Sequence, residues 1–112
     1  MRRRKRVLVD EGLSPRLHQL SDEEFEWISV VYRGWAGMLD GDLLARASRE
    51  FDFFLTADTK LPAQQPIAKL PITVVILRGG ARGFDDLVRY RLEIRRALRI
   101  AKVGRPNTIE LF

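Results

Sequence analysis

The sequence predicts a single α/β domain, 1–112, with a mainly parallel central sheet and helices on both of its faces. Two observations predict this fold. Apolar runs typical of strands alternate along the chain with segments of helical periodicity, and this alternation favours right-handed β-α-β units. The apolar runs at 7–9, 53–56 and 72–77 are continuous, which is typical of strands buried on both faces. Ligands of such sheets bind outside the carboxyl ends of the strands, so the residues that follow the strands are candidates for chemistry.

The first elements follow in order from local patterns. Strands and helices are expected at 6–9 (strand), 15–20 (short helix), 27–31 (strand), 40–50 (helix), 53–56 (strand), 72–77 (strand), 84–102 (helix) and 108–111 (strand). Ser14 and Pro15 begin the short helix, because serine is a favoured N-cap and proline is favoured at the first helical position. Segment 27–31 is rich in β-branched and aromatic residues, which favours a strand, although the acidic turn before it would also suit a helix cap.

The later elements rest on similar patterns. The helix at 40–50 has apolar residues at spacings close to one helical face. Pro62 and Pro66 indicate that segment 59–70 has little regular structure. Residues 72–77 form the strongest strand pattern of the chain. The helix at 84–102 is cationic and amphipathic, with the inward residues Leu87, Tyr90, Ile94, Leu98 and Ala101.

Composition excludes several classes of protein. No apolar run approaches the roughly 18–20 residues that span a bilayer. The apolar residues after the basic N-terminus end at Val9, before Asp10 and Glu11, so no signal-peptide core is expected. The sequence contains no cysteine, which excludes a disulfide framework, a thiolate metal site and a cysteine nucleophile. We therefore expect a cytoplasmic protein.

The net charge of +5 is unevenly distributed along the chain. Residues 1–56 hold 9 Lys or Arg against 10 Asp or Glu, whereas residues 57–112 hold 11 against 5. Such an excess of positive charge suits a polyanion such as nucleic acid, and it equally suits a soluble protein with one basic face.

Acidic residues follow two of the expected buried strands. Asp10 and Glu11 come directly after the first strand, and Asp58 follows the third. If these strands are neighbours in a parallel sheet, their acids lie side by side, and Asp40 and Asp42 from the intervening helix could reach the same edge. Carboxylates that converge without a basic partner repel one another, and Mg²⁺ or Mn²⁺ removes this penalty. Such a cation polarises a phosphodiester and activates water, so the pattern indicates metal-assisted hydrolysis of nucleic acid.

The same acids also have structural interpretations. Asp10 could cap the short helix, Asp40 could cap the next one, and Asp58 could open the turn before Pro62. Two apolar strands that each end in acid favour a shared site over three separate structural roles.

The order of several motifs resembles a known family. The matching segments cover nearly the whole chain: 6–17 (RVLVDEGLSPRL), 34–37 (GWAG), 41–44 (GDLL), 53–58 (FFLTAD) and 71–77 (PITVVIL). They resemble PIN-like proteins of the DUF5615 type, presumed nucleases of toxin–antitoxin systems. By this resemblance the fold is a PIN-like three-layer sandwich, and the activity is that of an endoribonuclease that depends on Mg²⁺ or Mn²⁺.

The resemblance also implies roles for individual residues. The metal ligands and catalytic acids would be Asp10, Asp42 and Asp58, and the secondary acidic candidates Glu11 and Asp40. Many relatives carry a further acid two residues beyond the position of Asp58, where this chain has Lys60. A lysine there would weaken metal binding or contact a phosphate instead. The implied partners are an RNA substrate and an antitoxin protein, and a homodimer is an open alternative.

Basic and aromatic residues are candidates for contacts with RNA. Phosphate contacts are expected from Lys60, Arg78, Arg82, Arg91 and Arg95. Arg91 and Arg95 lie in one row of the expected last helix, a spacing that is equally typical of a solvated face. Trp35, in a loop flanked by glycine, is expected either to stack on a base or to pack in the core.

Two other functions remain open. A PIN-like domain without catalysis would serve as an RNA-binding or partner-binding module, which Lys60 and the cationic last helix would suit. A receiver-like signalling domain also has acids after its first strand and a phospho-acceptor aspartate after its third, as Asp10, Glu11 and Asp58 have here. A receiver should also have Ser or Thr at the end of its fourth strand and Lys at the end of its fifth, and the expected strands here have neither.

Overall fold

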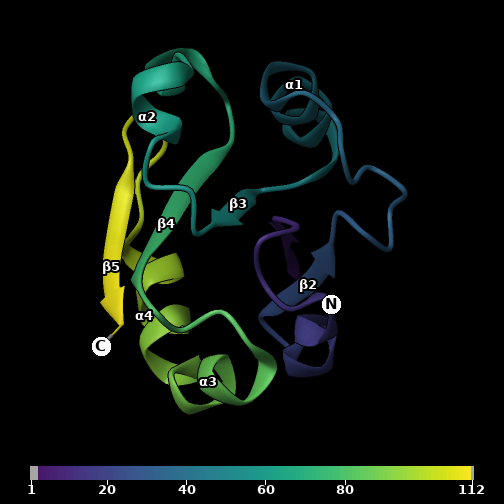
Figure 1. Cartoon of the computed structure of the whole chain (residues 1–112), viewed down its shortest axis with the longest axis vertical. Coiled ribbons are helices and arrows are strands. Elements are labelled where there is room, and N and C mark those ends of the chain that lie inside the picture. The colour runs from purple at the N-terminus through teal and green to yellow at the C-terminus, as the bar shows by residue number, and fades with distance from the viewer. Residues whose placement is uncertain (1–2, 112) are drawn as a thin grey trace.

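The computed structural model describes residues 3–111, which fold around one five-stranded sheet (Figure 1). The strands are β1 (Lys5–Val9), β2 (Phe25–Ser29), β3 (Phe53–Thr56), β4 (Thr73–Gly79) and β5 (Asn107–Leu111). They lie in the order β2-β1-β3-β4-β5, and every neighbouring pair is parallel. The expected α/β fold with a parallel central sheet is therefore confirmed.

Helices cover the sheet on opposite sides (Figure 1). They are η1 (Pro15–Leu20), α1 (Asp40–Glu50), α2 (Leu61–Gln64), η2 (Ile67–Lys69), α3 (Phe84–Arg89) and α4 (Arg91–Ile100), where η denotes a 3-10 helix. Val7 and Val9 of β1 pack in one core cluster with η1, α3 and α4, whereas Leu8 packs in a second cluster with α1, α2 and η2. Because successive strand residues point to opposite faces, the continuous apolar runs fill both clusters. Within residues 3–111, no helix is long and apolar enough to cross a membrane.

The first helix begins as the sequence predicts. Ser14 Oγ accepts a hydrogen bond from the N–H of Arg16 at 3.2 Å, and Pro15 occupies the first position of η1. In α1, Asp40 and Asp42 lie in the first turn, where the helix dipole stabilises negative charge. In chain order, η1 follows β1 and α1 follows β2.

β2 lies two residues earlier than the expected strand at 27–31. The carboxylate of Asp22 accepts the N–H groups of Glu24 and Phe25 at 2.8 and 2.9 Å, which fixes the turn from which the strand starts. After Ser29 the chain turns, although the apolar residues continue, so local composition placed the strand too late.

Segment 59–70, expected to have little regular structure, contains the two short helices α2 and η2. The carbonyl and the carboxylate of Asp58 accept N–H groups of the following residues, which starts α2 despite Pro62. Leu61 and Ile67 are buried in the core cluster on the α1 side. These two anchors order the segment, and the expectation from its prolines was wrong.

The single helix expected at 84–102 is two helices, α3 and α4, which meet at Tyr90. The N–H of Tyr90 bonds to the carbonyls of Leu87 and Val88, which ends α3, and its carbonyl accepts the N–H of Ile94 at the start of α4. Leu87, Ile94 and Leu98 are buried as expected. Their helical spacing continues across the break, so apolar periodicity alone gave no sign of it.

The strand order places a topological switch point between β1 and β3. From β1 the chain crosses to β2 at one edge, and from β3 it proceeds through β4 to β5 at the other. Ligands of doubly wound sheets bind at such a point, outside the carboxyl ends of the strands. Flavodoxin-like and receiver-like proteins share this strand order. The strand order alone therefore does not distinguish one function from another, and the residues at the strand ends have to be compared.

Candidate functional site

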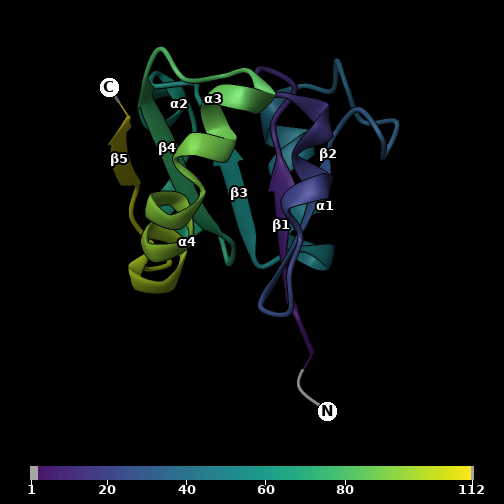
Figure 2. The ribbon, with the colours of Figure 1, turned by 90° about the horizontal axis from the view of Figure 1, so that it is seen from below.

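Asp10 and Asp58 leave neighbouring strands at the same edge of the sheet, the upper edge in Figure 2. β1 and β3 pair in register with Val9 opposite Leu55, and the N–H of Asp10 donates to the carbonyl oxygen of Leu55 at 2.9 Å. Asp10 therefore extends the pairing by one residue, and Asp58 follows the end of β3 by two. The predicted side-by-side arrangement of these two acids is what the structure has.

A depression of about 360 Å³ lies at this edge. Its lining residues are Asp10, Gly12, Ala57, Asp58, Thr59, Lys60 and Arg82. Asp10 comes from the end of β1, Asp58 and Lys60 from the loop after β3, and Arg82 from the loop between β4 and α3. The carbonyl of Arg82 accepts the N–H of Ser14 at 3.0 Å, which ties that last loop to the segment after β1. Carboxylates and cationic side chains thus share one concave surface at the switch point.

Asp10 is the most perturbed acid of the depression. Its Oδ2 accepts the hydroxyl of Thr56 at 2.6 Å, and its Oδ1 accepts the N–H of Glu11 at 2.8 Å. Burial raises the pKa of Asp10 above its ordinary value, and the negative charges of Asp40 and Glu11 raise it further. The two hydrogen bonds lower the pKa, and burial outweighs them.

Thr56 links the two acids. Its side chain is fully buried at the end of β3, and its hydroxyl donates to Asp10 while it accepts the N–H of Asp58 at 3.0 Å. Sequence reasoning gave Thr56 no role of its own. The signal that could have found it is a hydroxyl residue at the end of a buried strand, two residues before an acid.

Replacing Thr56 with valine is expected to lower the free energy of unfolding by about 1–3 kcal/mol, because the part-buried hydrogen bonds of its hydroxyl to the Asp10 carboxylate and to the N–H of Asp58 are both lost. The pKa of Asp10 should rise further, since a hydrogen bond to its charged form is lost. Chemical denaturation and NMR titration of the Asp10 carboxyl measure the two effects. Thr108→Val, at an exposed position of β5, is the control and should change neither. Equal stabilities of both variants and an unchanged Asp10 pKa would contradict the assigned hydrogen bonds.

The remaining acidic candidates, Asp40, Glu11 and Asp42, differ in how they relate to the depression. Asp40 acts on Asp10 through its charge, and Oε1 of the exposed Glu11 accepts the N–H of Gly37 at 3.4 Å. Asp42 is exposed in the first turn of α1 and does not line the depression. Among residues 3–111, no three His, Asp or Glu side chains converge closely enough to hold a metal ion. The acids that the structure brings to the depression are therefore Asp10 and Asp58, with Asp40 as an electrostatic neighbour.

Of the five basic candidates, only some line the depression. Lys60 and Arg82 line the depression. Arg78 pairs with Glu110 on β5 at 3.3 Å, and the exposed Arg91 at the start of α4 donates to the carbonyl of Val88 in α3 at 3.3 Å.

Arg95 does not belong to a free cationic row. It forms ion pairs with Asp22 at 3.0 Å and with Glu24 at 3.4 Å, and Arg99 binds the same Glu24 at 2.6 Å. The hydrogen bond from Arg99 holds the pKa of Glu24 below its ordinary value. The row of α4 that was expected to track phosphates is therefore largely engaged with acids that precede β2.

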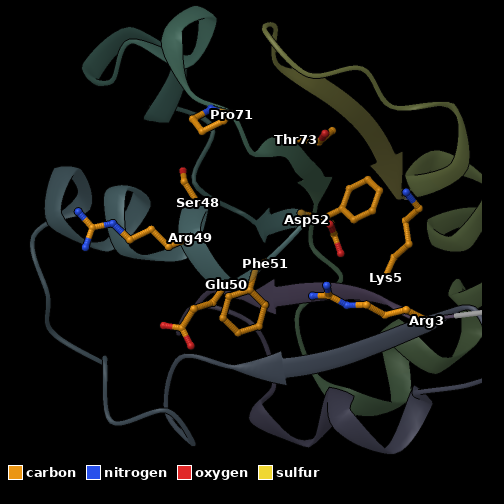
Figure 3. Close-up of a pocket in the computed structure, with 10 residues that line it drawn as sticks. Arg3, Lys5, Ser48, Arg49, Glu50, Phe51, Asp52, Pro71 and Thr73 are labelled. Carbon is orange, nitrogen blue, oxygen red and sulfur yellow. The ribbon is translucent and has the colours of Figure 1, made fainter.

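Another hollow, of about 420 Å³, lies at the opposite edge, where β1, β3 and β4 begin (Figure 3). Asp52 lies within it, and its Oδ2 accepts the N–H of Arg6 at 2.8 Å. Glu50 forms an ion pair with Arg33. Because both acids already have partners and the switch point is at the other edge, this hollow is the weaker candidate for chemistry.

Comparison with protein-family models, with curated proteins and with solved structures gave no match to this chain. The fold and the depression define an α/β protein with a mixed acidic and basic site at its switch point.

Proposed function

We propose that this protein is a PIN-like ribonuclease that depends on Mg²⁺ or Mn²⁺. The observation that carries the proposal is the depression at the switch point, where Asp10 and Asp58 are joined by Lys60 and Arg82. Carboxylates suit a hard divalent cation, and cationic side chains suit the phosphates of RNA. A cytoplasmic location and an antitoxin partner belong to the same proposal.

Electrostatics support a divalent cation at the two carboxylates. Asp10 is held by a hydroxyl and a backbone N–H, neither of which carries positive charge. Its raised pKa reflects burial and neighbouring negative charge, and a bound cation would offset both. Mg²⁺ is usually bound by one or two carboxylates together with substrate phosphates, so Asp10 and Asp58 suffice without a third acid. When bound, the cation would polarise the phosphodiester and activate water for its hydrolysis.

The other residues of the depression bind and orient the substrate. The N–H of Lys60 donates to Oδ1 of Asp58 at 2.9 Å, so the backbone of this lysine is fixed while its side chain remains exposed. Lys60 and Arg82 can therefore hold a phosphate beside the acids. Thr56 keeps the carboxylate of Asp10 in place through its hydroxyl.

The strand order supports a receiver-like phospho-acceptor as the second candidate. In this candidate Asp58 would accept the phosphoryl group. Its other requirements find no support, because β4 ends in Arg78 and Gly79 and β5 ends in Glu110 and Leu111. A noncatalytic RNA-binding module is the third candidate.

The test is a calorimetric titration of Mn²⁺ into the metal-free protein, followed by an RNA-cleavage assay. Wild type should bind Mn²⁺ and cleave RNA, and Asp58→Asn should lose both. Asp85→Asn, an exposed acid in the first turn of α3, is the matched control and should retain both. Asp42→Asn distinguishes a site of Asp10 and Asp58 alone from one that also includes Asp42. If only Asp10 and Asp58 bind the cation, the variant should retain Mn²⁺ binding. If Asp42 is also a ligand, as the family resemblance implies, the variant should lose it.

Two outcomes would overturn the nuclease proposal. Wild type that fails to bind millimolar Mn²⁺ and fails to cleave RNA would favour the noncatalytic module. Phosphorylation of Asp58 by a small phosphodonor, without RNA cleavage, would favour the receiver.

A further inference from the structure

The last strand leaves one edge of the sheet open. β5 pairs with β4 on one side, and no strand of residues 3–111 pairs with its other side. Figures 1 and 2 both show β5 as the outermost element on its side of the molecule. The carbonyl oxygen of Leu111 faces β4, because a Cβ at Gly79 would lie 2.0 Å from it. Backbone groups of successive strand residues point to alternate sides, so Thr108 and Glu110 direct their N–H and C=O groups outward.

The opposite edge of the sheet, β2, is covered by its own chain. The carboxylate of Asp22 accepts the N–H of Phe25 at 2.9 Å, and the N–H of Asp22 donates to the carbonyl of Phe25 at 2.9 Å. The hydroxyl of Ser21 accepts the N–H of Trp27 at 3.0 Å. The turn before β2 thus occupies outward groups of that strand. Because an open edge strand can pair with another chain, β5 is the edge that this fold leaves for such pairing.

β5 lacks the features with which proteins usually block an edge strand. These features are lysine, proline within the strand and β-bulges. β5 has the sequence NTIEL, and its one charged residue, Glu110, pairs with Arg78 at 3.3 Å. Ile109 packs against the core cluster on the α4 side and is only half-buried there. A strand added to this edge would therefore satisfy backbone groups and also cover apolar surface.

The pattern of β5 is complementary to itself in the antiparallel direction. When a two-fold axis passes beside Ile109, Thr108 of each copy lies opposite Glu110 of the other. Both residues face outward, so each of these pairs exchanges two hydrogen bonds. Ile109 then lies opposite Ile109 of the second copy, as the kind of pair whose side chains come closest. No like charges meet, because Glu110 lies opposite a threonine.

The open edge continues at its amino end into a groove of about 310 Å³ between α4 and β5. Ala97 and Ile100 line the groove from α4, and Pro106 and Asn107 line it from the start of β5. Ile100 is 67% exposed. In the antiparallel arrangement Leu111 of the second copy lies opposite Asn107, so the end of its β5 runs beside the groove. The second copy therefore covers apolar surface on α4 as well as the strand edge.

We propose that two copies of this chain pair through β5, antiparallel and centred on Ile109, so that one continuous sheet crosses both. A second copy fits this edge because the same residues supply the donors, the acceptors and a matching isoleucine on both sides. The covered edge at β2 stops further addition of strands, so the assembly closes as a dimer. This inference goes beyond the proposed ribonuclease function and does not depend on it.

The test is the molecular mass in solution from micromolar to millimolar protein concentration, measured by sedimentation equilibrium. Wild type should show a monomer–dimer equilibrium. Thr108→Pro removes the outward N–H and leaves the bonds to β4 in place, as is usual for proline in edge strands. It should weaken the dimer about 10- to 100-fold, because two intermolecular hydrogen bonds are lost by symmetry. Thr108→Val keeps the N–H and is the matched control, which should dimerise as wild type.

Charge at the same position tests the register. Position 108 lies opposite Glu110 of the second copy in the proposed pairing. Thr108→Glu should therefore weaken the dimer about 2- to 30-fold, and Thr108→Lys should strengthen it by a similar factor, since symmetry counts each cross-strand pair twice. The reverse order, or equal affinities of the two variants, would overturn the pairing centred on Ile109. These two variants decide the question if Thr108→Pro proves to be unfolded in denaturation curves.

Hydrogen exchange and a pair of variants on α4 locate the contact. The amides of Thr108 and Glu110 should exchange more slowly as the protein concentration rises, whereas the amide of Ile109, which faces β4, should be protected at every concentration. Ile100→Ser should weaken the dimer. Leu92→Ser is its control and should not, because Leu92 is 63% exposed on the same helix and does not line the groove.

The remaining outcomes separate this inference from the proposed function. Wild type that stays monomeric at millimolar concentration would overturn the dimer and leave the edge to a strand of a different protein. A dimer that Thr108→Pro retains in full would overturn β5 as the contact, and assemblies larger than a dimer would overturn the closed arrangement. RNA cleavage per chain should be equal in Thr108→Pro and wild type, because residue 108 lies outside the depression that carries the nuclease proposal.

Discussion

Replacing Asp10 with asparagine is expected to slow RNA cleavage about a thousandfold or more while making the folded protein more stable at neutral pH. Removing the acid removes a proposed ligand of the catalytic cation, and a loss of about 4 kcal/mol in transition-state stabilisation corresponds to a thousandfold. Burial raises the pKa of Asp10, which means that its charged form is disfavoured in the folded state. The neutral amide avoids that cost, so activity and stability should change in opposite directions.

The stability gain should depend on pH in one direction. The folded-state pKa of Asp10 is raised above the ordinary 3.8, so the folded protein binds this proton more tightly than the unfolded chain does. The resulting stabilisation is fully present below pH 3.8 and is lost as the pH rises through the folded-state pKa. Asparagine does not titrate, so the stability of Asp10→Asn relative to wild type should increase from acid to neutral pH.

Urea denaturation at several pH values and a cleavage assay at neutral pH measure both effects. Asp85→Asn is again the control, because its carboxyl is exposed on α3 and lies outside the depression. It should cleave as wild type and show no comparable gain of stability. Full activity in Asp10→Asn would remove Asp10 from the mechanism. A stability difference that stays constant with pH would mean that the Asp10 carboxyl is not desolvated.

The two acids of the site could be predicted from the sequence, because their positions depend on short local patterns in the chain. Asp10 and Asp58 were identifiable because each follows a continuous apolar run, and parallel strands bring their ends to one edge. The hydrogen bonds of Thr56 could not be read in the same way, because they require the register of β1 against β3. That register is set by packing between segments 46 residues apart, which no local pattern records.

The contacts of the basic residues likewise could not be predicted, because their partners lie far away in the sequence. Arg95 has helical spacing that suits a phosphate track, yet it pairs with Asp22 and Glu24, which lie more than 70 residues earlier in the chain. Nothing in the sequence around either partner marks the pairing. Similarly, the loop from Val30 to Leu39 showed its glycines but not which aromatic side chain it exposes. Burial of Trp35 and exposure of Tyr32 follow from the position of Phe51 and the end of β2.

Replacing Gly79 with alanine is expected to lower the free energy of unfolding by about 2–5 kcal/mol. Gly79 ends β4 with a φ of 115°, which side chains other than glycine rarely adopt, and such strain costs about 1–3 kcal/mol. A Cβ there would lie 2.0 Å from the carbonyl oxygen of Leu111 on β5, so one of the two strands must move. Leu111 is buried in the core, and exposing part of a leucine side chain adds about 1–2 kcal/mol.

The neighbouring Gly80 is a close control for this prediction. A Cβ at Gly80 has no atom within 4 Å, and its φ is not in the positive region, so Gly80→Ala should change stability by less than about 0.5 kcal/mol. Urea denaturation of both variants measures the difference. Equal stabilities would contradict the close approach of β5 to the end of β4.

The Gly79 variant also tests how the fold supports the site. Gly79 is the last residue of β4, and the loop that follows carries Arg82 to the depression and bonds to Ser14 after β1. If Leu111 yields to the new Cβ, the folded variant keeps its RNA affinity and loses only stability. If the end of β4 yields, Arg82 shifts and RNA affinity falls as well. We expect β5 to yield, because it is an edge strand, whereas the loop that follows β4 is anchored by the hydrogen bond between Arg82 and Ser14.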